Sequence, residues 1–277
     1  MKDIQAKATA DTLLVNDDDW GAFQLDAQAN DLTSKINGYL SITKSATQLV
    51  AEGGYNLGNL RPVPEEGELP DSLQAKYFDF SVNINSYSLD IAEYFVGDVM
   101  SDVTGAFDAN LRFTGLPAQP NVMGLMNIRD GGLTIDFLQT RYTFRESIVS
   151  VNNYLFDASG TILYDKLGHT AEVSGGIRHD HLRDLGFAAS MTTRRFLALE
   201  TDKDDNNLFY GRALGSGRVD FSGSFQKPNI YINASAGDST RISIPISAEK
   251  DVSDLTFVRF VDKHNPSSAD KGRRENE

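Results

Sequence analysis

Apolar and polar residues alternate one for one along most of the chain, and this period of two restricts the fold more than any other feature. The segment Phe107–Arg112 (FDANLR) is typical of the pattern. Successive side chains of a strand point to opposite faces, so each such segment predicts a strand with one apolar and one polar face. Strands of parallel sheets are buried on both faces and are continuous apolar runs instead. The sequence therefore predicts an all-β protein built on an antiparallel sheet.

The apolar rows of these predicted strands hold aliphatic residues, phenylalanine, alanine and glycine, and no charged residue. Small residues at such positions leave room for a sheet that curves or for something that lies against it. We therefore expect an elongated, curved sheet with the apolar rows on its concave side.

Two segments far apart in the chain share one pattern. Phe113–Gly115 (FTG) is followed after four residues by Pro120–Val122 (PNV), and Phe221–Gly223 (FSG) is followed at the same spacing by Pro228–Ile230 (PNI). A strand, a loop with glycine and proline, and a returning strand form a hairpin. The repeat indicates a sheet that grows by adding hairpins, each of which rests on its neighbours.

One segment, near 88–100, has helical spacing instead. Ser88 suits a helix start, and Ile91, Phe95 and Val99 follow at helical intervals. The sequence predicts a single short helix here.

Composition divides the chain into four parts. Residues 1–60 are predicted to form β-hairpin repeats, and residues 77–262 are predicted to continue the sheet. Between them, residues 61–76 are rich in proline and glutamate, which predicts a loop. Residues 263–277 are charged and polar, which predicts a disordered tail.

The chain carries 39 acidic and 26 basic residues, for a net charge of −13. Nucleic acids are bound by clustered Lys and Arg, so this balance argues against a nucleic-acid partner. The chain has no cysteine, which excludes disulfides and thiolate chemistry but leaves the compartment open. No apolar run approaches the ~20 residues of a spanning helix, so we expect no membrane span in this chain.

Candidate sites for metals or catalysis are few. His179-Asp180-His181, near Asp184, resembles a metal site, but a solvated strand end is favoured, and we expect no metal and no cofactor. The segment 202–207 (DKDDNN) lacks the glycine and glutamate of a calcium loop, and Asp17–Asp19 suits a hairpin turn. No nucleophile elbow, P-loop or dinucleotide glycine pattern is present, and no pair of carboxylates is placed to converge on a cleft. We therefore expect no enzyme.

Six short segments, spread over most of the chain, share a family likeness. They are Trp20–Leu25 (WGAFQL), Gly124–Ile128 (GLMNI), Leu197–Thr201 (LALET), Asn207–Ala213 (NLFYGRA), Gly217–Gly223 (GRVDFSG) and Thr240–Ile246 (TRISIPI). As an ordered set they resemble TamB-type proteins of the AsmA-like envelope family. The resemblance implies that the chain is an internal or C-terminal-region piece of a longer protein, which an N-terminal helix absent from this chain anchors in the inner membrane.

The resemblance implies a long β-sheet curled into a trough, or β-taco, that crosses the periplasm of a diderm bacterium. It implies a non-enzymatic role in phospholipid transport between the inner and outer membranes, and in the assembly of outer-membrane proteins. The implied partners are phospholipid acyl chains and an outer-membrane barrel of the TamA type, the latter through segments missing here. The large apolar residues of the rows would line the groove, namely Phe23, Leu25, Phe78, Phe80, Val82, Ile84, Phe107, Leu111, Phe113, Ile135, Phe137, Val173, Ile177, Val219, Phe221, Ile230, Ile232, Ile242 and Ile244.

Alternatives remain open at this point. Alternation alone does not separate an open trough from an apolar face that closes on itself as a sandwich core. A second hypothesis is a scaffold whose open sheet edges take up nascent barrel strands without carrying lipid. A third is a secreted β-sheet adhesin, which would need clustered aromatics or carboxylates on a polar face. The single tryptophan argues against it.

Overall fold

The computed structural model describes residues 4–15, 17–29, 35–56, 78–97, 99–205 and 208–245. The predicted loop at 61–76 and the predicted tail at 263–277 lie outside these residues. Within them, no helix is both long enough and apolar enough to cross a membrane.

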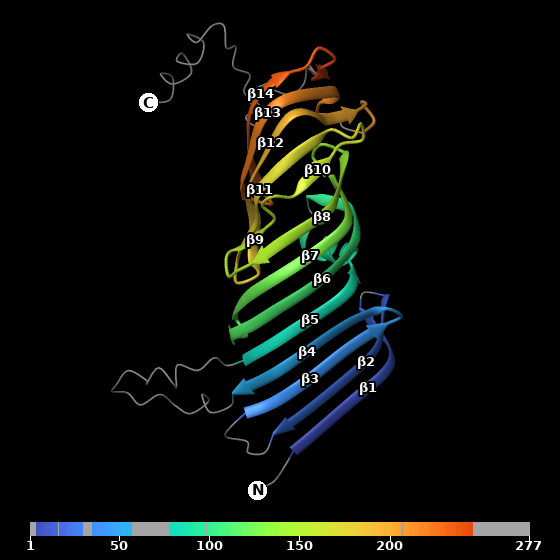
Figure 1. Cartoon of the computed structure of the whole chain (residues 1–277), viewed down its shortest axis with the longest axis vertical. Helices are drawn as coiled ribbons and strands as arrows, with labels where there is room; N and C mark the ends of the chain where they lie inside the picture. The colour runs from blue at the N-terminus through green and yellow to red at the C-terminus, as the bar shows by residue number, and fades with distance from the viewer. Residues whose placement is uncertain are drawn as a thin grey trace, which may run out of the picture.

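The described residues form one antiparallel sheet of 15 strands and a single short helix, which confirms the predicted all-β fold (Figure 1). The strands are β1 (Ile4–Val15), β2 (Asp18–Ala29), β3 (Lys35–Lys44), β4 (Thr47–Asn56), β5 (Phe78–Ser88), β6 (Met100–Leu116), β7 (Gln119–Ile135), β8 (Thr140–Val151), β9 (Leu155–Asp157), β10 (Ile162–Tyr164), β11 (Thr170–Asp180), β12 (Arg183–Thr201), β13 (Tyr210–Ser224), β14 (Lys227–Ala236) and β15 (Arg241–Ser243). Neighbours in the sheet are neighbours in sequence, so the sheet is a meander with β1 and β14 at its two ends.

Two positions in the sheet are each shared by two strands. β9 and β10 share the place between β8 and β11, and β14 and β15 both pair with β13. In the break between β9 and β10, the buried hydroxyl of Thr161 lies 2.6 Å from the buried hydroxyl of Ser147 in β8. This pairing satisfies both hydroxyl groups where the ladder of backbone hydrogen bonds is interrupted.

The predicted helix is present between β5 and β6. It begins as a 3₁₀ turn, Leu89–Ala92, and continues as one α-helical turn, α1 (Glu93–Val96). Ser88 stands at its N-cap but its side chain makes no capping hydrogen bond. Leu89 and Val96 are buried, while Phe95 is 66% exposed. Of the predicted stripe, Ile91 packs against the core and Phe95 does not, and Leu89 takes the main buried position.

The two copies of the repeated pattern form hairpins with the same register. Gly115 faces Pro120 in the β6–β7 hairpin, and Gly223 faces Pro228 in the β13–β14 hairpin. Both glycines have positive φ, 103° and 87°, and a Cβ atom on either would crowd an asparagine amide on the returning strand at 3.1 or 2.9 Å. The predicted hairpin repeat is confirmed, and conformation and space both require glycine at these turns.

The sheet bends strongly in its middle. In a flat sheet the turn after β11 would lie about 14 Å from β7, three strand spacings away. Instead, Nδ1 of His181 in that turn is 3.1 Å from the carbonyl oxygen of Pro120 in β7. In the same way, the Tyr142 hydroxyl of β8 donates to the carbonyl of Ala198 in β12 at 3.0 Å. Such contacts between strands that are not neighbours require the sheet to curve.

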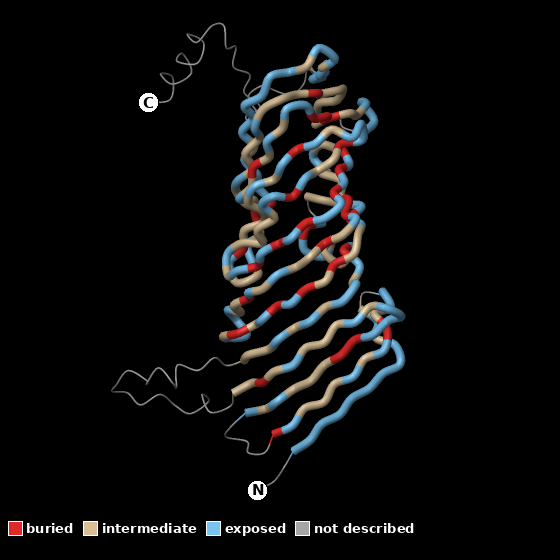
Figure 2. The backbone as a smooth tube through the Cα atoms, in the orientation of Figure 1, coloured by how far each residue is buried: buried red, intermediate tan, exposed pale blue. Residues whose placement is uncertain are grey.

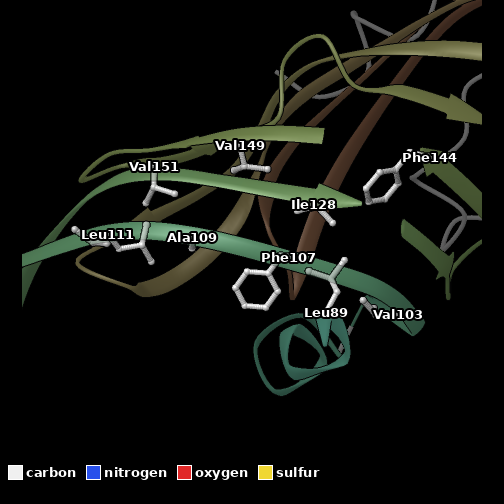
Figure 3. Packing of buried hydrophobic residues seen from close by; sticks show 10 residues of the cluster. Leu89, Val103, Phe107, Ala109, Leu111, Ile128, Phe144, Val149 and Val151 are labelled. Carbon is white, nitrogen blue, oxygen red and sulfur yellow. The ribbon is translucent and has the colours of Figure 1, made fainter. Parts of the chain in front are cut away.

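The apolar core lies inside this bend, mainly on β6, β7 and β8 (Figure 2). Its buried members are Leu89, Val103, Phe107, Ala109, Leu111, Val122, Ile128, Phe144, Val149 and Val151. Figure 3 shows Leu89 reaching from the helical turn towards Phe107 and Val103. Phe156, Leu163 and Leu182, from later strands and the β11–β12 turn, also pack against the cluster. Burial of each large member stabilises the fold by about 1.5–3 kcal/mol.

An irregularity lets β8 face the core along its whole length. Val149 is buried, and so is Phe144, although strict alternation would place these two on opposite faces. The change occurs at Arg145–Glu146, where two consecutive residues are exposed; nearby in β7, Asp130 has a φ of 49°. Beside it, Gly131 leaves room for the Phe144 ring, which would overlap any Cβ atom at that position.

Candidate apolar binding face

One row of side chains runs without a break across the whole sheet. Residues directly opposite each other in neighbouring strands point to the same face. The register connects, in order, Ala8, Leu25, Leu40, Ala51, Val82, Leu111, Gly124, Val151, Phe156, Ile177, Phe187, Gly223 and Pro228. At ~4.8 Å per strand this path is about 58 Å long. We call the face that carries this row the apolar face.

The neighbouring rows are apolar as well. On one side the row connects Phe23, Ile42, Leu49, Ile84, Ala109, Met126 and Val149, and further along the sheet Gly175, Ala189, Phe221 and Ile230; on the other side the register connects Ala27, Gly38, Gly53, Phe80, Phe113 and Val122. None of these rows holds a charged residue. Most of the predicted lining residues lie in them or beside them, so the period of two placed these residues on one surface.

Four of the predicted lining residues lie at strand ends. Ile135 packs against a second small cluster around Tyr142 and Phe196. The prediction that Phe137 continues a strand is wrong, because it lies in the turn after β7, with its ring centroid 5.1 Å from that of Phe209. The other two are Ile242, which is in β15 and 44% exposed, and Ile244, which follows that strand and is 37% exposed.

The apolar face is packed in its middle and open towards both ends. Leu111 and Val151, in the middle, are 8% and 3% exposed. On β2 to β5 the large residues of the face are half-buried, apart from the buried Ile42, and Ile232 on β14 is 64% exposed. The face is therefore neither an open trough throughout nor a closed sandwich core throughout. It has two accessible stretches, β1–β5 and β11–β14, separated by the core.

The helix lies across the apolar face beside the first of these stretches. The Glu93 carboxylate accepts the backbone N–H of Val103 at 2.6 Å, which holds the helix to β6. The Tyr94 hydroxyl donates to the Asp18 carboxylate at the β1–β2 turn. Next to it, Tyr87 at the end of β5 contacts Trp20 of β2 at 5.9 Å between ring centroids. The helix thus packs against β5 and β6 and reaches β2 through Tyr94.

The histidine pair has a structural role. His179 is 3% exposed; its Nδ1 accepts the Leu182 backbone N–H at 3.1 Å, and its Nε2 lies 2.9 Å from the Asn152 carbonyl. Both ring nitrogens are therefore engaged by the chain, which fixes a neutral tautomer. Burial lowers the pKa of His179 below its ordinary value. In the described part of the chain, no group of three or more His, Cys, Asp or Glu could hold a metal ion.

The two acidic segments form turns. β1 and β2 join in a tight hairpin in which Val15 pairs with Asp18, as predicted for Asp17–Asp19. In the loop after β12, Asp202 accepts the backbone N–H of Asp204 at 2.8 Å, and Asp205 accepts the N–H of Asp202 at 2.9 Å. These carboxylates bind the turn itself. Residues 206–207 lie outside the described part.

The opposite face of the sheet is polar and carries cross-strand ion pairs. Arg112 binds Asp79 through two hydrogen bonds of 2.8 and 2.7 Å, and Arg129 pairs with Asp108. The Arg129 guanidinium, with the Ser86 backbone N–H, holds the pKa of Asp108 below its ordinary value. These groups are substantially exposed, so solvent screens the pairs and they contribute little to stability. Their main effect is to keep this face hydrated and so to define the apolar face by contrast.

A polar pocket of about 470 Å³ lies near the start of β11, lined by Asp130, Arg145, Tyr164 and Asp165 among others. Burial alone would raise the pKa of Asp165, but hydrogen bonds from the Leu197 and His169 backbones and the His169 ring outweigh it, and the pKa lies below its ordinary value. The carboxylate thus ties the β10–β11 turn to β12. It is fully engaged and has no acceptor position left for acid–base chemistry.

Sequence reasoning missed the contribution of β8 and β12 to the apolar face, and of all of β7 except Ile135. In β7 and β8, large apolar residues also occupy the other face, where Leu125 and Ile148 are 57% and 61% exposed. The alternation is therefore blurred in these strands. The pattern Phe187, Ala189 and Met191 was a usable signal for β12.

Comparison of the chain with protein-family models, with curated proteins and with solved structures gives no match. The likeness to TamB-type proteins therefore rests on the short sequence segments alone. The fold and the apolar face stand independently of it.

Proposed function

We propose that this chain is a non-enzymatic carrier that shields phospholipid acyl chains on its apolar face. The observation that supports this most directly is the uncharged row that crosses thirteen strand positions in continuous register. Acyl chains need a surface that is long, apolar and free of charge. The open stretches at both ends give such chains access to that surface.

The free-energy cost of exposing acyl chains to water explains what such a surface would do for a lipid. A two-chain lipid has roughly 30 methylenes, each worth about 0.8 kcal/mol, so exposing both chains to water costs on the order of 25 kcal/mol. An apolar path about 58 Å long removes most of that cost for a lipid that crosses an aqueous space. By the resemblance to TamB-type proteins, we place this transport in the periplasm of a diderm bacterium, between the inner and outer membranes, with an outer-membrane barrel of the TamA type as partner.

The experiment compares two neighbouring residues that differ only in the face they occupy. A photoreactive amino acid replaces Ala234, on the apolar face, or Ser235, on the polar face; both positions are exposed in β14. The full chain is incubated with phospholipid vesicles and irradiated, and lipid adducts are measured by mass spectrometry. We expect adducts at position 234 in large excess over position 235.

A charge in the same stretch tests the mechanism. Ile232→Glu should leave the chain folded, because a side chain at this position stays hydrated, and should reduce crosslinking at position 234 because lipid tails would have to desolvate the carboxylate. Circular dichroism monitors folding. Equal crosslinking at positions 234 and 235, or a folded Ile232→Glu protein with normal crosslinking, would contradict the proposal.

A second candidate function, an assembly scaffold, is favoured by the edge at β14. Within the described residues β14 pairs on one side only, which leaves a row of backbone groups that a nascent barrel strand can bind. A scaffold would tolerate Ile232→Glu and would bind synthetic barrel-strand peptides. A lipid carrier would lose lipid on the same substitution.

A further inference from the structure

The two end strands of the sheet differ in how they are protected. β1 carries Lys7 in the centre of its exposed edge and has a register shift between Ala10 and Leu13. Edge lysines and bulges are the devices by which proteins prevent edge-to-edge pairing. In β14 a lysine and a proline occupy only the first two positions, Lys227 and Pro228; from Asn229 to Ala236 the strand holds no charge and no proline, and its register with β13 is unbroken.

β14 also exposes large side chains on both faces. Tyr231 on the polar face is 68% exposed, and Ile232 on the apolar face is 64% exposed. A long, uncharged edge strand with exposed large residues is a strong template for pairing with another strand. Figure 1 shows β14 at the end of the long axis opposite to β1, away from the bend and its core.

The sequence of this strand complements itself. In an antiparallel pair of two copies centred on Asn233, Ile232 of one copy faces Ala234 of the other, and Ile230 faces Ala236. On the polar face, Tyr231 faces Ser235 and the two Asn233 side chains face each other. Large residues thus meet small ones, amide meets amide, and no like charges are opposed.

We infer that β14 pairs with β14 of a second copy, so that the protein forms a two-fold dimer through the edges of its sheets. The two-fold axis is normal to the sheet at Asn233. Such an axis reverses the strand direction but keeps each face on its own side, so the apolar faces of the two copies join into one surface. The interface is isologous and closed, which gives a dimer and not a filament. This inference concerns assembly, and it stands whether or not the face carries lipid.

The absence of native cysteine makes the register directly measurable. Asn233→Cys places two thiols opposite each other on the axis, within the Cα separation of 4.4–6.8 Å typical of disulfides. Tyr231→Cys is the matched control, because in the same dimer its two copies are about 13 Å apart along the strand. Under mild oxidation of the full chain, we expect a disulfide-linked dimer from Asn233→Cys and only background from Tyr231→Cys. The double variant Tyr231→Cys/Ser235→Cys should crosslink again.

Sedimentation and light scattering without lipid provide the second measurement. The wild-type chain should have twice the 30.4 kDa mass of one copy. Asn233→Lys opposes two like charges and should weaken the dimer by about tenfold or more. Gln5→Lys on β1 is a control that should leave it unchanged.

A wild-type chain that stays monomeric at about 100 μM, or equal crosslinking at positions 231 and 233, would overturn the inference. A chain that is monomeric and binds a barrel-strand peptide along β14 would also overturn it, because the free edge of β14 would then bind another protein's strand and not a second copy. Because lipid is absent from these measurements, such a failure is distinct from a failure of lipid binding.

Discussion

Removing one apolar side chain from the middle of the sheet should be far more costly than removing one from its end. Leu111 is 8% exposed and belongs to the central cluster, whereas Ile232 is 64% exposed on β14. Truncation of a buried leucine costs about 2–5 kcal/mol through lost burial and the cavity that remains. Ile232→Ala removes side-chain surface that is largely hydrated already, so its cost should stay within about 0.5–1 kcal/mol.

The assay is urea unfolding of the full chain, followed by circular dichroism and by the fluorescence of the single tryptophan, Trp20. At about 2–4 °C per kcal/mol, Leu111→Ala should also lower the melting temperature by roughly 5–15 °C, and Ile232→Ala by only a few degrees. Equal losses for the two variants would refute the division of the apolar face into a packed middle and open ends. A small loss for both would mean that the sheet is open throughout.

Further predictions test other parts of the fold. Gly131→Ala should destabilise the protein by about 1–3 kcal/mol, because the new methyl group overlaps the Phe144 ring, while Gly38→Ala, whose Cβ atom would meet the Phe80 ring at an ordinary 3.6 Å, should be nearly neutral in the same melting experiment. Because burial lowers the pKa of His179, its contribution to stability is complete above its unfolded pKa of about 6.5 and is lost as the pH falls through the lower folded pKa. The free energy of unfolding should therefore decrease from pH 7.5 to pH 5, and decrease less in His179→Gln; an identical pH dependence would count against this role. Single cysteines at Asn110 and Arg112 should react with a soluble maleimide faster than cysteines at Ala109 and Leu111, and equal rates would contradict the assignment of two faces.

The antiparallel sheet, the hairpin repeat and the place of the helix could be predicted from short stretches of the sequence. The antiparallel sheet follows from the period of two, since each strand needs only its own alternation to define its faces. The hairpin repeat follows from Gly115 and Gly223, because the turn itself requires glycine there. The place of the helix was predictable, but its packing was predictable only in part: Ile91 packs against the core as the spacing indicates, whereas Phe95 is exposed and Leu89 is buried instead.

The bend and the packed middle could not be predicted, because they depend on contacts between distant strands. His181 contacts Pro120, and Tyr142 contacts Ala198, across strands that intervene in the sheet. No local pattern indicates such pairs. The change of alternation at Arg145–Glu146 could not be predicted either. It can be interpreted only once the structure shows that β8 faces the core along its whole length.

The packed middle defines the main barrier for a lipid that moves along the proposed path. A tail passing from the β1–β5 stretch to the β11–β14 stretch must displace part of the cover of the central cluster, and the helix contributes to that cover through Leu89. Exposing its two buried side chains, Leu89 and Val96, costs about 3–6 kcal/mol at 1.5–3 kcal/mol each. Between about four and eight methylenes, at about 0.8 kcal/mol each, recover that amount when they take the place of the helix. A single acyl chain supplies more methylenes than this, and the surplus counts against the loss of the Glu93 and Tyr94 hydrogen bonds that hold the helix. On the proposed function, a lipid tail that passes the middle of the face therefore takes the place of the helix, because exposing the same side chains to water without a tail has no such compensation.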